Sequence, residues 1–168
     1  MGKGLPRSLA RAPKSTAVVR KLTIPIKNLV VAMTDVTTNG AWGTAVLRGL
    51  PEGNILLLGV IEYLQLTGGA GQSTTFVATT AVGTAPTAEQ TLAGAEVDIL
   101  AAAAMSAATA SVSPMTRAAS ATAQMIDNTD ASKELNLNVT LVDAGSTANG
   151  DMLANGVIYI TYVVMGDD

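Results

Sequence analysis

Polar and apolar residues alternate with a period of two in several separate stretches of this chain. The alternation is cleanest in Lys133–Val142. The apolar positions there are Leu135, Leu137, Val139 and Leu141, and the polar ones between them are Glu134, Asn136, Asn138 and Thr140. A period of two puts successive side chains on opposite faces of an extended strand, whereas a helix needs a period of about 3.6. This segment is therefore predicted to be a strand with one face in a core.

A similar alternation runs through Val157–Met165 and Lys21–Val31. The residues of Val157–Met165 that we expect to face inward are Ile158, Ile160, Tyr162 and Val164. Lys21–Val31 has a proline, Pro25, near its middle. Because proline has no N–H to donate to a neighbouring strand, we expect this segment to be an edge strand or to contain a bulge.

The most hydrophobic segment is Ile55–Thr67 (ILLLGVIEYLQLT), in which both alternating faces are mainly apolar. One of these faces also holds a carboxylate, Glu62. Such an apolar run is typical of a central strand covered on both sides, and a buried helix is the alternative. Turn residues on both flanks, in Leu50–Asn54 and Gly68–Ser73, favour the strand.

Shorter segments complete the expected fold. Further strands are predicted over Ala41–Leu47, Thr74–Val82, Ala95–Leu100 (with Val97 and Ile99 inward) and Thr109–Val112, with some strand within Ser113–Ala131. Ala101–Ala108 (AAAAMSAA) is the best candidate for a helix, although it is short. The total is seven or eight strands bounded by turns, without a βαβ rhythm. We therefore expect an all-β fold, an antiparallel β-sandwich or jelly-roll-like body.

Charge is distributed unevenly along the 168 residues. Seven of the ten basic residues lie within the first 27 positions, and no acidic residue precedes Asp35. Residues 1–27 therefore carry +7, while the rest, with three basic and 13 acidic residues, carries −10. Pro6 and Pro13 disfavour a helix near the N-terminus. We expect an extended basic N-terminal arm over residues 1–20 and a β-sandwich domain over residues 21–168, with a disordered terminus as the alternative for the arm.

The arm is the candidate partner-binding segment, because it combines cations with apolar anchors. Its residues of interest are Lys3, Leu5, Arg7, Leu9, Arg11, Lys14, Val18, Arg20 and Lys21. Such a segment suits a groove on an acidic protein surface, or it can add a strand to an exposed sheet edge. It can also neutralise phosphates, but scattered cations without interleaved aromatic residues, on an acidic body, argue against nucleic-acid binding.

Catalysis has few residues to work with, because the chain contains no His and no Cys. Their absence removes the Ser-His-Asp triad, cysteine nucleophiles, zinc sites of His or Cys, and disulfides. Two groups of carboxylates remain, the pair Glu96 and Asp98 and the cluster Asp127, Asp130 and Glu134. Carboxylates are usually solvated, and this cluster lacks the spacing of a calcium loop. We therefore predict a protein that is not an enzyme and has neither cofactor nor metal.

Other binding motifs are incomplete. Gly68–Gly71 (GGAG) matches neither a dinucleotide-binding nor a phosphate-binding loop. No apolar run approaches the roughly 20 residues of a membrane-spanning helix, and the basic N-terminus has no secretory apolar core, so no membrane partner is expected. Four aromatic residues, Trp42, Tyr63, Tyr159 and Tyr162, are the candidates for a carbohydrate-binding groove, although core packing is the ordinary role of such side chains.

The basic arm precedes a chain that is rich in Ala, Thr and Gly. Four of its stretches are Lys21–Val31 (KLTIPIKNLVV), Gly83–Gln90 (GTAPTAEQ), Ala118–Asn138 (AASATAQMIDNTDASKELNLN) and Gly156–Asp168 (GVIYITYVVMGDD), together about a third of the chain. With these features the sequence resembles structural proteins of tailed-bacteriophage virions, most of all the small capsid decoration, or cement, proteins.

This resemblance implies a β-sandwich or barrel that sits on the capsid at subunit junctions, often as a trimer, and braces the shell against internal DNA pressure. It implies the major capsid protein and copies of itself as partners, a place on the capsid surface of the virion, and synthesis in the host cytoplasm. The arm would reach onto neighbouring subunits, and no catalytic residue is implied. A tail, collar or fibre-anchoring protein is one alternative, and a carbohydrate- or surface-binding β module is another.

Overall fold

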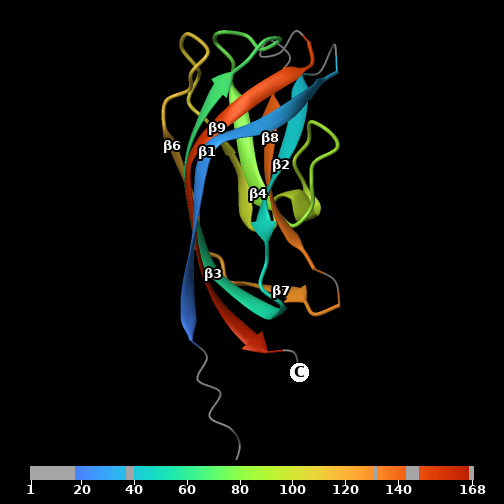
Figure 1. Cartoon of the computed structure of the whole chain (residues 1–168), viewed down its shortest axis with the longest axis vertical. Coiled ribbons are helices and arrows are strands. Elements are labelled where there is room, and N and C mark those ends of the chain that lie inside the picture. The colour runs from blue at the N-terminus through green and yellow to red at the C-terminus, as the bar shows by residue number, and fades with distance from the viewer. Residues whose placement is uncertain (1–17, 37–39, 131, 143–147, 167–168) are drawn as a thin grey trace, which may run out of the picture.

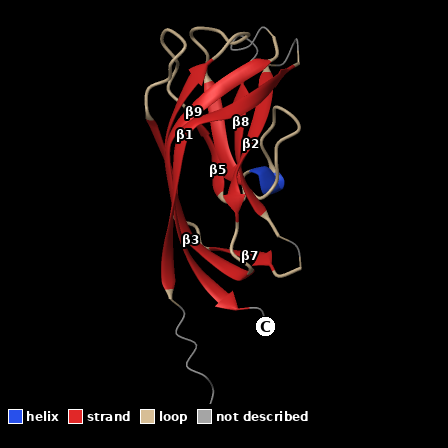
Figure 2. Ribbon diagram, in the orientation of Figure 1, coloured by secondary structure: helices blue, strands red, loops and turns tan. Residues whose placement is uncertain are grey.

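The computed structural model of the protein describes residues 18–36, 40–130, 132–142 and 148–166. They form an elongated body made almost entirely of strands (Figures 1 and 2). The elements are β1 (Val19–Asp35), β2 (Ala41–Gly49), β3 (Gly53–Gly68), β4 (Ala78–Gly83), the single 3-10 turn η1 (Gly94–Glu96), β5 (Leu100–Ala104), β6 (Thr116–Ser120), β7 (Gln124–Asn128), β8 (Glu134–Leu141) and β9 (Gly150–Gly166). Within the described residues, no helix is long and apolar enough to cross a membrane.

The strands pair in a nested order, and every pairing is antiparallel. β1 pairs with β9, β2 with β8, β3 with both β6 and β7, and β4 with β5. Two further pairings, β9 with β3 and β8 with β4, complete two layers, and a short pairing of β1 with β2 joins these layers into one continuous sheet. We call β1-β9-β3-β6, with β7 continuing along β3, the first sheet, and β2-β8-β4-β5 the second sheet. This nesting is the topology of a jelly roll and confirms the expected all-β fold.

The inner faces of the two sheets meet in one hydrophobic core. On β8 the predicted alternation is confirmed, because all four of its apolar residues are buried in this core. On β9 the residues expected to face inward do so: Ile158, Ile160 and Tyr162 are buried, and Val164 packs against the core. Full burial of such a side chain is worth about 1.5–3 kcal/mol, so the core is what holds the sheets together.

Residues 84–99, the loop that carries η1, lie over β8 on the outer face of the second sheet, while Val46 of β2 stays 52% exposed. The side chain of Asn138 points from β8 toward this loop and is fully buried. Its Oδ1 accepts a hydrogen bond from the Thr87 amide at 2.9 Å, and its Nδ2 donates to the carbonyls of Ala85 and Glu96, each at 2.9 Å. We call residues 84–99 the covering loop, because they bury the second face of β8.

No described segment covers the outer face of the first sheet in this way. On β3 the inner face is buried, while outward residues such as Leu58 and Ile61 are only half-buried and Tyr63 is 37% exposed. The expectation that Ile55–Thr67 is a central strand is confirmed, since β9 lies on one side of β3 and β6 and β7 on the other. The expectation that both of its faces are covered is wrong, because the covering loop lies over the other sheet.

Pro25 lies on an edge strand that also has a bulge, as predicted. β1 pairs with β9 along most of its length, but β2 joins its other edge only at Ala32–Asp35. The register shifts between Ile26 and Leu29, and Asn28 there adopts a left-handed φ of 49°. A bulge of this kind bends the strand, and β1 indeed curves strongly along the body (Figure 1).

Three sequence-based expectations for shorter segments are wrong. Ala101–Ala108 does not form a helix, because its first residues belong to β5, which pairs with β4. Ala95–Leu100 is not a strand but contains the end of η1 and leads into β5. Thr109–Val112 forms a tight turn with two residues of positive φ, Ala110 and Ser111. For Ala101–Ala108, pairing with β4 outweighs a weak local preference for helix, whereas the other two segments form local turns.

Candidate functional site: the open face of the first sheet

The candidate arm falls mainly outside the described residues. The arm residues that lie outside the described part of the chain are Lys3, Leu5, Arg7, Leu9, Arg11 and Lys14. Val18 is described and is 59% exposed. β1 begins at Val19, so Arg20 and Lys21 lie in this strand. In β1 these two cations alternate: Arg20 is opposite Tyr162 on the inward side, and Lys21 points outward.

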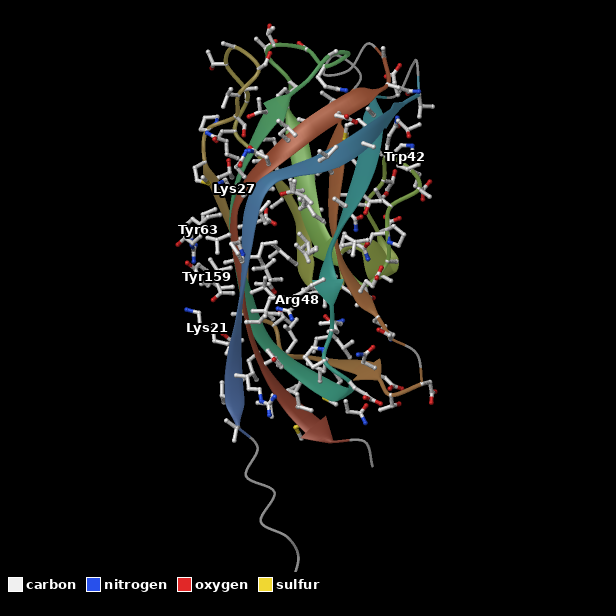
Figure 3. The ribbon with its side chains drawn as sticks, in the orientation of Figure 1. Lys21, Lys27, Trp42, Arg48, Tyr63 and Tyr159 are labelled. Atoms are coloured by element: carbon white, nitrogen blue, oxygen red, sulfur yellow. The ribbon has the colours of Figure 1, made fainter. Side chains whose placement is uncertain are left out.

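Lys21 lies on the outer surface of the first sheet, which we call the open face. A groove of about 810 Å³ crosses this face over β1, β9, β3 and β6. Its lining includes Lys21, Tyr63, Tyr159 and Arg117. Figure 3 shows Lys21, Tyr63 and Tyr159 on one side of the molecule.

Strand register brings the two tyrosines together. Tyr159 is opposite Ile61, and Tyr63 is opposite Val157, so the two rings are diagonal neighbours on β9 and β3. Diagonal positions on one sheet face lie within reach of aromatic side chains. The Lys21 Nζ lies 4.5 Å from the centroid of the Tyr159 ring, a cation–π contact.

Arg117 provides the second positive charge of the groove. It is opposite Tyr63 in the pairing of β6 with β3 and is exposed. No carboxylate is among the residues that line the groove. Arg117 was not a candidate in the sequence, because no local motif surrounds it; only the pairing of β6 with β3 brings it beside Tyr63.

Cross-strand rows of apolar residues flank the groove. One row runs across all four strand positions and consists of Val19, Val163, Leu56 and Met125. Its two ends, Val19 and Met125, are 60% and 55% exposed. The groove is therefore flanked by apolar residues, and its lining carries two cations, Lys21 and Arg117.

The four aromatic candidates do not form one platform. Tyr63 and Tyr159 share the groove, whereas Tyr162 points into the core and is buried. Trp42 lies on β2, in the second sheet, on the other side of the molecule (Figure 3). Of the four aromatic residues predicted for a carbohydrate-binding groove, the structure therefore brings two together, Tyr63 and Tyr159.

The predicted carboxylate groups serve the local backbone. Asp98 accepts hydrogen bonds from both the amide and the hydroxyl of Thr84, at 2.8 and 2.5 Å, and so closes the covering loop. Glu96 accepts one from the Ala93 amide. Asp127 accepts two from Thr129, and these bonds hold the pKa of Asp127 below its ordinary value. Among the described residues, no group of carboxylates is arranged to hold a metal ion.

A different carboxylate is buried between the sheets. Glu62 points inward from β3, is 2% exposed, and accepts a hydrogen bond on Oε1 from the Thr80 hydroxyl at 2.9 Å. Its Oε2 is buried without a partner. Burial raises the pKa of Glu62 to about 7, and the hydrogen bond from Thr80 opposes part of that rise. The signal was present in the sequence, since an acid on the apolar face of an alternating strand has to point into a core.

The sequence matches no protein-family model and no curated protein. Among solved structures, the chain is similar to one in the cyanophage Pam1 capsid asymmetric unit, with 18% identity, a TM-score of 0.42, and coverage of 92% of this chain and 95% of that one. It is also similar to the infectious bursal disease virus VP2 subviral particle, with 11% identity and a TM-score of 0.42, covering 90% of this chain but 36% of that one. A third is the C-terminal CBM6 of LamC from Zobellia galactanivorans, with 12% identity and a TM-score of 0.27, covering 83% of this chain and 98% of that one. Because these TM-scores are low, the jelly-roll assignment rests on the strand pairing described above.

Proposed function

We propose that this chain is a structural protein of a virion, and specifically a capsid decoration, or cement, protein. The jelly roll is an architecture of viral capsid and lectin domains, among others. Since a fold by itself does not determine function, the surface has to support the choice. The observation that carries the proposal is the open face. It is a largely apolar sheet surface with two cations in its groove, and the basic N-terminal segment joins β1 at one end of this surface.

The residue inventory supports binding over catalysis. The sequence has no His or Cys, and the groove has no acid to act as a proton donor or acceptor. Glu62 is enclosed in the core with Thr80 as its one hydrogen-bond partner. We therefore propose that the protein is not an enzyme and works through its surfaces.

In this proposal the body is a rigid wedge on the capsid surface, and residues 1–17 reach onto neighbouring subunits. The partners are the major capsid protein and further copies of this chain, with a trimer as the expected assembly. Positive charges on the arm steer the chain toward acidic patches on the shell. Individually weak contacts become effective because many copies bind one lattice. The protein would be made in the host cytoplasm and then become part of the virion.

The test is binding to empty capsids assembled from the major capsid protein of the same virus. Full-length protein and a variant that begins at residue 18, which leaves β1 intact, are mixed with these capsids at low and high salt. Sedimentation measures the bound fraction, and negative-stain imaging locates it. We expect regular density on the shell for the full chain, weakened by salt, and little for the truncated one. Normal occupancy by the truncated chain would refute the role of the arm, and rings or tubes without capsid binding would favour a tail or collar protein.

One observation favours a second candidate function, carbohydrate binding. Tyr63 and Tyr159 are neighbours in an open groove, and tyrosines of this kind can stack on sugar rings. A glycan array would show binding that Tyr159→Ala abolishes and Trp42→Ala leaves unchanged, because Trp42 lies on the other sheet. The aliphatic lining of the groove favours a protein partner over a sugar.

A further inference from the structure

The outer faces of the two sheets differ in what covers them. On the second sheet the covering loop hydrogen-bonds to the buried side chain of Asn138, and the outward residues of β8 other than Glu134 are buried. On the first sheet, outward residues of β3 stay half-buried or exposed, and so do those of β9 apart from Val163, which is 6% exposed. We propose that the open face docks on an acidic protein surface, whose apolar side chains cover the apolar rows and whose carboxylates pair with Lys21 and Arg117. The inference rests on the proposed function in taking that partner to be the capsid shell.

Strand register places apolar residues in rows on the open face. Beside the row that ends at Val19 and Met125, a second row joins Pro25, Val157 and Tyr63 and ends at Arg117. Scattered single apolar residues are normal on a protein surface, but contiguous rows across four strands mark an interaction site.

The carboxylates of the first sheet lie away from the centre of the open face. In the described strands of the first sheet, Glu62 points into the core, and Asp35 and Asp151 lie at strand ends. Asp127 is exposed on β7 beside the Met125 end of the first row, and one of its carboxylate oxygens accepts two hydrogen bonds from Thr129. The centre of the open face therefore has Lys21 and Arg117 without a negative neighbour in the groove lining. An acidic partner would be complementary to it.

A second copy of this chain is a poor occupant. Two open faces related by a two-fold axis would place Lys21 and Arg117 of both copies in one interface, with no carboxylate from either groove lining to pair with them. Packing the open face onto the covering loop of the next copy would join opposite sides of the body, and such head-to-tail contacts give an open stack unless the rotation between copies closes them into a ring. Two cations in an apolar surface are also too few for strong binding to a nucleic acid. These points leave a different, acidic protein surface.

The experiment compares matched substitutions on the two sheets in the full chain. Arg117→Glu reverses an exposed arginine on the open face, and Arg48→Glu reverses an exposed arginine on β2. Val19→Ser and Val46→Ser form the apolar pair, at 60% and 52% exposure. We expect Arg117→Glu to weaken binding to empty capsids at least about tenfold and Val19→Ser to weaken it several-fold, while the β2 variants stay within about twofold.

A second measurement does not depend on capsids. ¹⁵N-labelled full-length protein is titrated with a short peptide of alternating Glu and Leu, with the Lys–Leu counterpart and with a dT oligonucleotide. We expect the Glu–Leu peptide to shift resonances of Lys21, Tyr63, Tyr159 and Arg117, and expect Arg117→Glu to abolish the shifts.

The outcomes separate this inference from the proposed function. Capsid binding that Arg117→Glu and Val19→Ser leave unchanged would overturn the docking face and leave the cement role standing. No capsid binding, with peptide shifts confined to the open face, would keep the docking face and overturn the cement role. Absence of both would overturn both. Stronger shifts with the oligonucleotide than with the peptide would make the open face a nucleic-acid surface and overturn the inference.

Discussion

The two sheets of this jelly roll have similar inner faces and different outer ones. On the second sheet, the covering loop satisfies Asn138 and closes over β8, so the chain buries that face itself. On the first sheet, Tyr63 and its neighbours are left for another molecule or for water. The difference teaches that one architecture can cover one of its sheets with its own loop and leave the outer face of the other open, according to where that loop lies.

The largest effect is expected from Asn138→Ala. The substitution leaves the Thr87 amide and the carbonyls of Ala85 and Glu96 without their partner under the covering loop. A buried polar group without a partner costs about 1–3 kcal/mol, so the free energy of unfolding should fall by about 3 kcal/mol or more. Urea unfolding followed by circular dichroism measures it.

The matched control is Asn136→Ala on the same strand and face. Asn136 is also buried, at 3% exposure against 0% for Asn138. Its side chain makes one hydrogen bond, from Nδ2 to the Glu134 carbonyl at 3.3 Å. The loss of stability in Asn136→Ala should be clearly smaller than in Asn138→Ala. Equal losses would mean that the loop does not depend on Asn138, and the contrast between the sheets would weaken.

A pH effect of similar size is expected inside the sandwich, where Glu62 of the first sheet meets Thr80 of the second. Its pKa rises from 4.5 in an exposed carboxyl to about 7 in the folded chain. The folded state therefore binds the proton more tightly, and the resulting stability is complete below pH 4.5 and is lost as the pH rises through 7. The loss should approach about 3 kcal/mol.

Glu62→Gln removes this titration while keeping an acceptor for the Thr80 hydroxyl. Thermal unfolding of both proteins between pH 4 and 8 checks the prediction. The difference in stability between them should change across that range in favour of the variant at high pH. A constant difference would show that the carboxyl titrates normally and that water reaches the space between the sheets.

A smaller effect is expected where the covering loop approaches β4. A Cβ added at Gly83 would lie 2.3 Å from the carbonyl oxygen of Ala95, a backbone atom that cannot move aside easily. Gly83→Ala should therefore lower stability by about 1–3 kcal/mol. Gly49→Ala is the control, because nothing lies within 4 Å of a Cβ there. Equal melting temperatures for the two variants would mean that the loop packs loosely.

The smallest effect on stability is expected on the open face. Arg117→Glu and Val19→Ser change exposed side chains, so the free energy of unfolding should stay within about 0.5 kcal/mol of the parent. Chemical denaturation beside the binding assays would test this. A large loss of stability in either variant would indicate that the face is held by contacts within the chain, and the comparison between the sheets would fail.

Several elements could be predicted because their signal is local. The alternation in β8 and β9 identified strands and their inward residues, and Pro25 identified an edge strand with a bulge. The alanines of β5 led to the incorrect prediction of a helix. A short run of good helix formers has too little helix preference to outweigh pairing with β4. The groove could not be predicted, because Lys21, Tyr63, Tyr159 and Arg117 come from four strands and meet only through register.

By itself, the sequence determined the strand periodicity, the absence of His and Cys chemistry and the concentration of cations near the N-terminus. These depend on residue type and on spacing along the chain. Only the tertiary structure decided which sheet is covered, that Glu62 faces Thr80, and that Arg117 joins Tyr63 on the open face. Each of these depends on contacts between residues far apart in the chain, and a period of two says which residues share a face but not what will lie against it.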